Sequence, residues 1–161
     1  MCGIVGITAN ESVSSNIIGA LKKLEYRGYD SAGIAINTES QIHQKKAKGK
    51  LDNLILSLQK DGFDGKVGIG HTRWATHGEP SERNAHPHSS RKVSLVHNGI
   101  IENASELKSR AELKNYNFES DTDSEVITAL ITHYLNEGRD HMDSVKQALS
   151  LLEGSYALAI I

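Results

Sequence analysis

The only cysteine of this chain stands at position 2, where its thiol could act as a nucleophile. A free thiol has a pKa of about 8.5, so it is mostly protonated at neutral pH and needs a base within reach. Removal of Met1 would leave Cys2 with a free α-amine, whose pKa of about 7.7–8.0 is close to that of the thiol. The amine could therefore accept the thiol proton without a separate histidine. Position 2 predicts an N-terminal nucleophile, and the alternative is a small buried residue in a first strand.

Attack of a thiolate on a carboxamide also requires donors for the oxyanion of the tetrahedral intermediate. The pair Asn98-Gly99 follows a predicted strand and offers a side-chain amide and an unhindered backbone N–H. The same dipeptide is the commonest signal of a short turn. Taken alone, it indicates a turn more strongly than an oxyanion hole.

If the carboxamide belonged to an amino acid, its amino-acid end would need a cation for the carboxylate and an anion for the ammonium. Arg73 is followed closely by Trp74, Thr76 and His77, which could together bind the carboxylate. Asp123 stands beside the start of a predicted helix, where N–H groups and the macrodipole stabilise an anion. It could bind the ammonium, but helix-start electrostatics explains an aspartate there equally well.

The periodicity of apolar residues predicts the elements that must position these groups. Strands are expected at 2–8, 32–37, 41–47, 67–71, 93–96 and 156–161, and helices at 12–24, 51–58, 102–113, 126–135 and 142–152. Thr122 and Glu125, three residues apart, predict a capping box at the start of the fourth helix. The stretch 72–90 is the longest irregular segment, and such loops are usually functional. This order of elements favours an α+β layered domain over a doubly wound sheet.

The composition is typical of one globular domain. The chain has 161 residues, of which 38% are hydrophobic and 24% charged, and a net charge of −2. Its lysines and arginines form no basic stripe, which argues against nucleic-acid binding. No apolar run approaches the roughly 20 residues of a membrane span, and the start lacks the pattern of a signal peptide. We therefore expect a soluble cytoplasmic protein. Because the chain stops inside a predicted strand, we also expect a longer polypeptide.

Five segments, taken in order, carry a resemblance to a known family. They are Cys2-Gly3-Ile4-Val5-Gly6, residues 24–33, residues 71–78, Val96-His97-Asn98-Gly99 and residues 120–126. The series closely resembles the glutaminase domains of the glucosamine-6-phosphate synthase family, which are class II glutamine amidotransferases, and the resemblance covers the whole chain. The phosphoribosyl-pyrophosphate amidotransferases share the cysteine start, the Arg-Gly-x-Asp-Ser-Ala-Gly turn and Asn-Gly. They usually lack the loop Arg-Trp-Ala-Thr-His-Gly, which therefore favours the first family.

The resemblance implies a fold and an activity. The fold would be the four-layer α/β/β/α sandwich of two antiparallel sheets found in N-terminal-nucleophile hydrolases. Residues 1–161 would form a glutaminase domain that lacks its C-terminal part, with the sugar-isomerase domain absent from this chain. The reaction would release ammonia from L-glutamine without a cofactor. The ammonia would be used on fructose 6-phosphate by the isomerase domain of a homo-oligomeric full-length enzyme.

The same resemblance implies the catalytic roles. Cys2 would be the nucleophile, with its own amine as base, and Asn98 and Gly99 would form the oxyanion hole. Arg73 would hold the substrate carboxylate, and Asp123, with the Gly99 carbonyl, would hold the ammonium.

The remaining implied roles belong to residues around these groups. They are Thr76 and His77 beside the carboxylate, the Trp74 backbone lining the pocket, Arg27 and Gly28 flanking the nucleophile, and His86 supporting the loop after Arg73.

Two alternative interpretations compete with this one. Five histidines, at 71, 77, 86, 88 and 97, raise the possibility of a metal site. There is no second cysteine and no His-Glu-x-x-His spacing, so we expect no metal. The other alternative is an inactive folding or interaction module left by truncation.

Overall fold

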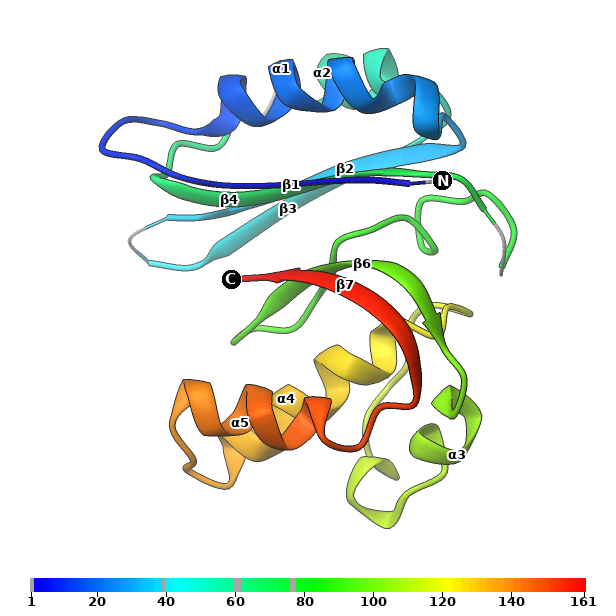
Figure 1. Cartoon of the computed structure of the whole chain (residues 1–161). Coiled ribbons are helices and arrows are strands. Elements are labelled where there is room, and N and C mark those ends of the chain that lie inside the picture. Colours follow the sequence, from blue (N-terminus) through cyan, green and yellow to red (C-terminus); the bar gives the residue numbers. More distant parts are fainter. Residues whose placement is uncertain (1, 39, 60–61, 76–77) are drawn as a thin grey trace.

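The computed structural model describes residues 2–38, 40–59, 62–75 and 78–161. Two antiparallel sheets pack face to face, and helices cover the outer face of each (Figure 1). This arrangement confirms the expected α/β/β/α sandwich. Thr76 and His77, predicted as site residues, lie outside the described residues. Within the described ranges, no helix combines the length and apolar character that crossing a bilayer requires.

The first sheet has the strand order β1-β4-β2-β3 and carries the N-terminal end of the chain. Its strands are β1 (Gly3–Thr8), β2 (Ser31–Asn37), β3 (Ile42–Lys48) and β4 (Val67–Arg73). Helices α1 (Ser14–Leu24) and α2 (Leu51–Leu58) lie on its outer face (Figure 1). The apolar stripe of α1 buries Ile17 and Leu21 completely, against Ile34 and Ile36 of β2. The amphipathic pattern of the sequence thus sets which face of this helix meets the sheet.

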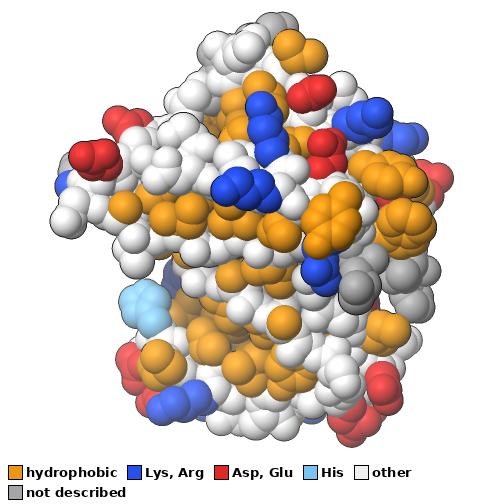
Figure 2. Space-filling model, turned by 45° about the horizontal axis from the view of Figure 1, so that its top comes forward, with side chains coloured by type: hydrophobic (Ala, Val, Ile, Leu, Met, Phe, Trp, Pro, Cys, Tyr) orange, Lys and Arg blue, Asp and Glu red, His pale blue; other side chains and the backbone are white. Residues whose placement is uncertain are grey.

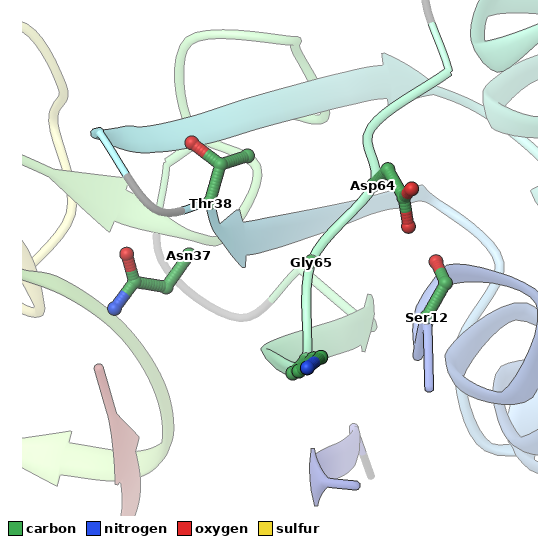
Figure 3. Close-up of a pocket in the computed structure, with 6 residues that line it drawn as sticks. Ser12, Asn37, Thr38, Asp64 and Gly65 are labelled. Atoms are coloured by element: carbon green, nitrogen blue, oxygen red, sulfur yellow. The ribbon is translucent and has the colours of Figure 1, made fainter. Parts of the chain in front are cut away.

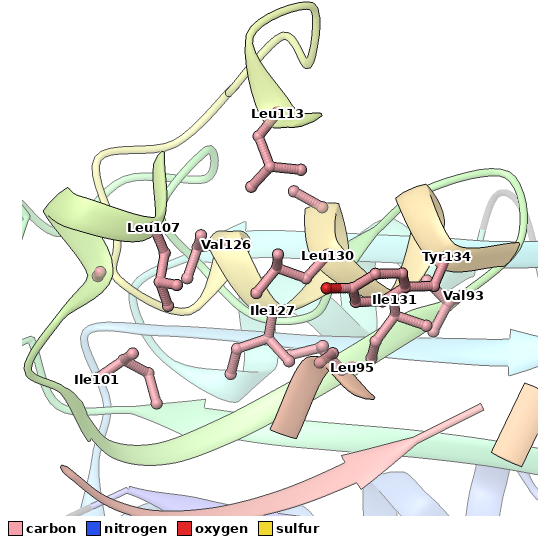
Figure 4. Packing of buried hydrophobic residues seen from close by; sticks show 13 residues of the cluster. Val93, Leu95, Ile101, Leu107, Leu113, Val126, Ile127, Leu130, Ile131 and Tyr134 are labelled. Carbon is pink, nitrogen blue, oxygen red and sulfur yellow. The ribbon is translucent and has the colours of Figure 1, made fainter. Parts of the chain in front are cut away.

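The second sheet has the order β5-β6-β7, from β5 (His88–Ser89), β6 (Ser94–Ile101) and β7 (Gly154–Ile160). Helices α4 (Glu125–Asn136) and α5 (His141–Leu149) cover it, with α3 (Ala104–Lys108) at one end (Figure 1). Figure 4 shows the core between them, where Ile127, Leu130 and Ile131 of α4 meet Leu95 of β6. α4 is buried along most of its length, which explains its nearly continuous apolar sequence.

The edge of the second sheet remains open at β7. Among the described strands, β7 pairs only with β6, and its first four residues are exposed. On the face shown in Figure 2, hydrophobic side chains are visible along the middle of the molecule. Tyr156 of β7 and Ile100 of β6 are among the large hydrophobic residues exposed to solvent.

The register of β1 against β4 positions the N-terminal residue of the site. Gly3 pairs with Thr72, so Cys2 comes next to the end of β4, beside Arg73 and Trp74. Between the two sheets, Ile69 of β4 and Val96 of β6 are both buried. The site therefore forms where the ends of β1 and β4 face the middle of β6.

Two predicted elements differ from the structure at residues of the site. The strand predicted at 93–96 continues to Ile101, so Asn98-Gly99 lies inside β6, paired with Ala157 and Tyr156 of β7, and forms no turn. Pairing with a strand more than fifty residues later overrides the local turn signal. The strand predicted at 67–71 continues to Arg73, which therefore lies on a strand and not in the irregular segment.

The capping box predicted for the fourth helix is also wrong, although its start is right to within one residue. α4 begins at Glu125 with Ser124 as N-cap, and Thr122 makes no capping bond. The Glu125 carboxylate instead accepts hydrogen bonds from the N–H groups of Glu119 and Ser120 and from the Ser120 hydroxyl. The helix predicted at 102–113 is interrupted, with α3 at Ala104–Lys108 and a 3-10 turn at Ala111–Leu113.

Candidate active site

The half-buried Cys2 thiol lies against the main chain of Trp74. Trp74 N–H donates to Cys2 Sγ over 3.2 Å, and the Trp74 carbonyl oxygen lies 3.6 Å from the same sulfur. Trp74 itself is 45% exposed. The sulfur is thus held by backbone atoms that do not depend on the Trp74 side chain.

The turn at residues 27–30 holds the segment that contacts the thiol. A Cβ on Gly28 would lie 2.7–2.8 Å from backbone atoms of Arg73 and Trp74, so only glycine allows this approach. Asp30 N–H donates to the Arg73 carbonyl over 3.1 Å, and the Asp30 carboxylate accepts from Ala75 N–H. The Arg-Gly-Tyr-Asp sequence is therefore a scaffold for residues 73–75.

Asn98 lies on β6 with its carboxamide bonded at both ends. Its Nδ2 donates to the Cys2 carbonyl oxygen over 3.1 Å, and its Oδ1 lies 2.8 Å from His71 Nε2. The next residue, Gly99, has a φ of +133°, a conformation that other residues rarely adopt. The backbone at Gly99 also passes so close to Ser155 that a Cβ would overlap the Ser155 carbonyl.

Arg73 and Asp123 bring opposite charges to one cavity. The Arg73 guanidinium donates to the carbonyls of Gly78 (3.2 Å) and Glu79 (3.4 Å). Burial lowers the pKa of Arg73, and the nearby Cys2, Asp30 and Asp123 act in the opposite direction. Asp123 Oδ2 accepts from Ile101 N–H over 2.7 Å, which fixes this carboxylate at the end of β6.

A small cavity of about 40 Å³ joins the groups described so far. Its lining comes from the ends of β1 and β4, the segment before β5, β6 and the segment before α4: Cys2, Arg73, Trp74, His86, His97, Asn98, Gly99, Thr122, Asp123 and Ser124. A larger cavity of about 560 Å³ shares Cys2, Trp74, Asn98 and Gly99 with it and is also lined by Arg27. The sulfur and the Asn98-Gly99 pair thus border both spaces.

Four buried histidines pack behind the site. The ring of His86 lies 4.4 Å from that of His71, 4.7 Å from that of His88 and 6.4 Å from that of His97, measured between centroids. Burial lowers the pKa of all four, that of His71 to about 4. They are therefore neutral at pH 7 and act as hydrogen-bonding groups.

The Ser124 hydroxyl links this histidine layer to the carboxylate of the cavity. It lies 3.0 Å from His86 Nε2, 2.7 Å from His97 Nδ1 and 3.3 Å from Asp123 Oδ1. If it donates its one proton to Asp123, both ring nitrogens donate to it. Within the described part of the chain, no three His, Cys, Asp or Glu side chains are arranged to hold a metal ion.

The structure brings most of the predicted site residues together. Cys2, Arg73, Asn98, Gly99 and Asp123 border one cavity, although they come from four separate segments. His86 also lines this cavity, and among the described residues its side chain bonds to Ser124. Thr76 and His77, which were also predicted as site residues, lie outside the described residues.

Sequence reasoning missed Ser124 and the role of His71 as a partner of Asn98. Ser124 stands at the N-cap of α4, next to Asp123, and this position alone marks it as a polar group near the cavity. His71 stands two residues before Arg73 on β4, so both side chains share one face of the sheet. That spacing could have grouped His71 with the site.

A second open cavity, of about 440 Å³, lies between the loop before α1 and the ends of β2 and β4. Figure 3 shows Ser12, Asn37 and Thr38 around it, with Asp64 and Gly65 on the segment leading into β4. Its described lining includes no cysteine or histidine, and it shares no residue with the cavities around Cys2. We therefore place the candidate active site at Cys2.

Comparisons with known proteins show which family the chain is similar to. A family model described as "Glutamine amidotransferase domain" matches residues 71–161. Two relatives carry the name glutamine–fructose-6-phosphate aminotransferase (isomerizing). The one from Mesorhizobium japonicum is 51% identical over 161 residues, and the one from Clostridium acetobutylicum is 52% identical over 163. Each alignment includes 100% of this chain and 26% of the relative, so the chain spans about a quarter of the length of these curated relatives.

Solved structures show the same fold. Glutamine phosphoribosylpyrophosphate amidotransferase from B. subtilis superposes with a TM-score of 0.84 at 29% identity, over 100% of this chain and 35% of that chain. A glutamine aminotransferase class-II domain protein from Silicibacter pomeroyi gives a TM-score of 0.63 at 14% identity, over 100% of this chain and 72% of that one. The second likeness concerns the fold alone.

Proposed function

This chain belongs to the glutamine amidotransferase domain family, and from that premise we propose that it releases ammonia from the side-chain amide of L-glutamine, with Cys2 as the nucleophile. The observation that carries the proposal is that the Cys2 thiol and the Asn98 carboxamide border the cavity that also holds Arg73 and Asp123. A nucleophile, an oxyanion donor and two charges of opposite sign are what an amino-acid amide requires.

The proposed reaction proceeds by acyl transfer. Once Met1 is removed, the Cys2 α-amine takes the thiol proton, and the thiolate attacks the γ-carboxamide carbon. The tetrahedral intermediate collapses, the C–N bond breaks, and ammonia leaves with the proton held by the amine. Water then hydrolyses the γ-glutamyl thioester, which yields glutamate and restores the thiol.

Asn98 and Gly99 are proposed as the oxyanion donors. One Nδ2 hydrogen of Asn98 is used by the Cys2 carbonyl, at 3.1 Å, and the second remains for the developing oxyanion. Because of its positive φ, the peptide group at Gly99 is oriented differently from one in a regular strand. Loss of one such donor costs about 2.7–4 kcal/mol of transition-state stabilisation in hydrolases.

Arg73 and Asp123 are proposed to select an amino acid. Arg73, joined by Thr76 and His77, would bind the substrate α-carboxylate, and Asp123, with the Gly99 carbonyl, would bind the α-ammonium. The bond from Ile101 N–H to Asp123 supports this role, because it holds the carboxylate in place without neutralising it. Charge-assisted bonds of this kind are stronger than neutral ones.

We further propose that the ammonia is used on fructose 6-phosphate by a sugar-isomerase domain of a longer, homo-oligomeric polypeptide in the cytoplasm. Identities of 51% and 52% to proteins named glutamine–fructose-6-phosphate aminotransferase support this acceptor. The identity to the phosphoribosylpyrophosphate amidotransferase is lower, at 29%. A reducing compartment suits a mechanism that needs a free thiol.

The test compares the full-length gene product with its Cys2→Ala variant. We expect the parent to release glutamate from glutamine, and the variant to release none. With fructose 6-phosphate and an added ammonium salt in place of glutamine, the variant should still form the amino sugar. Intact mass must show that Met1 is absent. Glutamate release by Cys2→Ala at the parent rate would refute the nucleophile.

A further inference from the structure

His71 is the buried partner of the proposed oxyanion donor. It lies on β4, two residues before Arg73, and its ring is fully buried. Its Nε2 lies 2.8 Å from Asn98 Oδ1, whereas its Nδ1 has no hydrogen-bond partner among the described residues. Among the described residues, His71 does not bond to the Cys2 thiol and does not line the small cavity.

The chemistry of the neighbours fixes which atoms carry hydrogens. The Cys2 carbonyl can only accept, so the NH₂ end of Asn98 must face it, at 3.1 Å. The amide oxygen of Asn98 then faces His71 and can only accept, so His71 Nε2 must carry a hydrogen. Burial lowers the pKa of His71 to about 4, so the ring is neutral at pH 7 and Nδ1 carries only a lone pair. The Cys2 carbonyl thus sets the tautomer of His71 through the Asn98 amide.

The alternative orientation of the amide is disfavoured at the Cys2 end. Rotation by 180° would place the Asn98 oxygen against the Cys2 carbonyl oxygen, so two acceptors would face each other inside the protein, where unsatisfied polar groups are costly. The Cys2 carbonyl therefore selects the orientation, and the Nε2–H of His71 holds the oxygen end of the amide in it.

We infer that His71 is a positioning residue for glutamine hydrolysis, which holds the Asn98 carboxamide so that its NH₂ group points toward Cys2 and the oxyanion. The inference rests on the proposed function of Asn98. The other three buried histidines do not share this bond, since His86 and His97 contact Ser124 and His88 contacts Thr122. His71 is thus the member of the layer whose hydrogen bond reaches the oxyanion donor.

The test is a double-mutant cycle in the full-length gene product. His71→Phe keeps a planar ring and removes the donor, and we expect kcat for glutamate release to fall roughly 3- to 10-fold, the equivalent of one neutral hydrogen bond. The KM for glutamine should not change, because Arg73 and Asp123 hold the amino-acid end. In an Asn98→Ala background, His71→Phe should have no further effect on kcat. His71→Gln, whose amide can donate from a similar position, should recover most of the rate.

A matched control separates positioning from general stability. His88 is buried to a similar degree in the same layer, 4% exposed, but its Nε2 lies 3.0 Å from Thr122 Oγ1. Any effect of His88→Phe on kcat should be the same with and without Asn98→Ala. Equal effects of His71→Phe in both backgrounds would overturn the inference and leave the proposed function intact. Parent protein that releases no glutamate would instead refute the proposed function.

A second measurement does not depend on activity or on the folding of any variant. With histidine labelled with ¹⁵N in the parent protein, the ring-nitrogen chemical shifts of His71 should report the neutral tautomer with its hydrogen on Nε2 near pH 7. A hydrogen on Nδ1 in its place would contradict the inference, because Asn98 Oδ1 would then have no donor.

Discussion

The main-chain N–H of Trp74 donates to the sulfur of Cys2 over 3.2 Å, although 71 residues lie between the two in the sequence. The contact exists because β1 pairs with β4 and because the turn at Gly28 and Asp30 holds the backbone of residues 73–75. The thiol proposed as the nucleophile is therefore positioned by backbone geometry. The indole ring takes no part in this bond and meets the ring of Tyr29 at a centroid distance of 5.6 Å.

Trp74→Ala should therefore leave glutamate release nearly unchanged. The variant keeps the N–H that contacts the thiol, and we expect kcat to stay within about threefold of the parent, a change of less than 1 kcal/mol in the barrier. Steady-state glutamate assays measure this. A loss of tenfold or more would assign the indole a direct part in the hydrolysis.

Asn98→Ala should reduce kcat by about 10²–10³, because it removes one of the two proposed oxyanion donors. The KM for glutamine should remain close to that of the parent, since the amide donor acts in the transition state. A rise in KM with unchanged kcat would place Asn98 in ground-state binding. Glu102→Ala, at an exposed position just beyond β6, serves as the control.

Gly99→Ala should lower both stability and activity. The φ of +133° is strained for any residue with a Cβ, at a cost of about 1–3 kcal/mol, and the added Cβ would collide with the Ser155 carbonyl. Gly19→Ala is the matched control, because Gly19 is exposed in α1 with no atom within 4 Å of an added Cβ. It should raise the free energy of unfolding by about 0.5–1 kcal/mol. Urea denaturation measures both, and equal stability of the two variants would contradict the strain argument.

The buried histidines predict that stability falls in mild acid. Their pKa values are lowered by burial, that of His71 to about 4, whereas histidines of the unfolded chain titrate near 6.5. As pH falls below about 6.5, the unfolded state binds protons that the folded state does not, so the free energy of unfolding decreases. The decrease is at most about 1.4 kcal/mol per pH unit for each histidine, and the contribution of His71 levels off below its folded pKa.

Chemical denaturation between pH 7 and 5 measures this slope. His88→Gln, which can still bond to Thr122, should reduce the slope because it removes one buried titrating ring. His141→Gln should not, since His141 is exposed. An unchanged slope in His88→Gln would show that the acid sensitivity has another origin.

Sequence patterns predicted the bounds of helices and strands correctly where the local sequence determines the structure. The helix expected at 51–58 is α2 with the same bounds, because its apolar residues keep helical spacing from Leu51 to Leu58. The strands around residue 40 were also predicted to within a residue or two. The capping box predicted at Glu125 was wrong, because its carboxylate accepts hydrogen bonds from the N–H groups of Glu119 and Ser120 and therefore does not cap α4.

The site was less predictable because its contacts are distant in sequence. Asn98-Gly99 has the local signature of a turn, and only pairing with β7 keeps it inside a strand. The bond from Asn98 to His71 joins two strands of different sheets, which no spacing in the sequence reveals. The family resemblance supplied the candidate residues, and the fold supplied their mutual orientation.

Asp123→Asn should weaken glutamine binding with little effect on the chemical step. Asparagine keeps an oxygen that can accept from Ile101 N–H, at 2.7 Å in the parent, so the local fold should persist. The substitution removes the negative charge proposed to meet the α-ammonium. A charge-assisted hydrogen bond contributes about 1.5–3 kcal/mol, so the KM for glutamine should rise about 10- to 100-fold while kcat changes little.

The matched control for this variant is Asp121→Asn, two residues earlier. Asp121 is exposed and pairs with Arg83 outside the cavity, so its variant should keep the parent KM. If Asp123→Asn also kept the parent KM, Asp123 would have no part in ammonium binding, and its carboxylate would serve only to hold the end of β6. If both variants raised KM equally, the effect would come from the general negative field near α4. A selective effect of Asp123 is therefore the result that links this carboxylate to an amino-acid substrate.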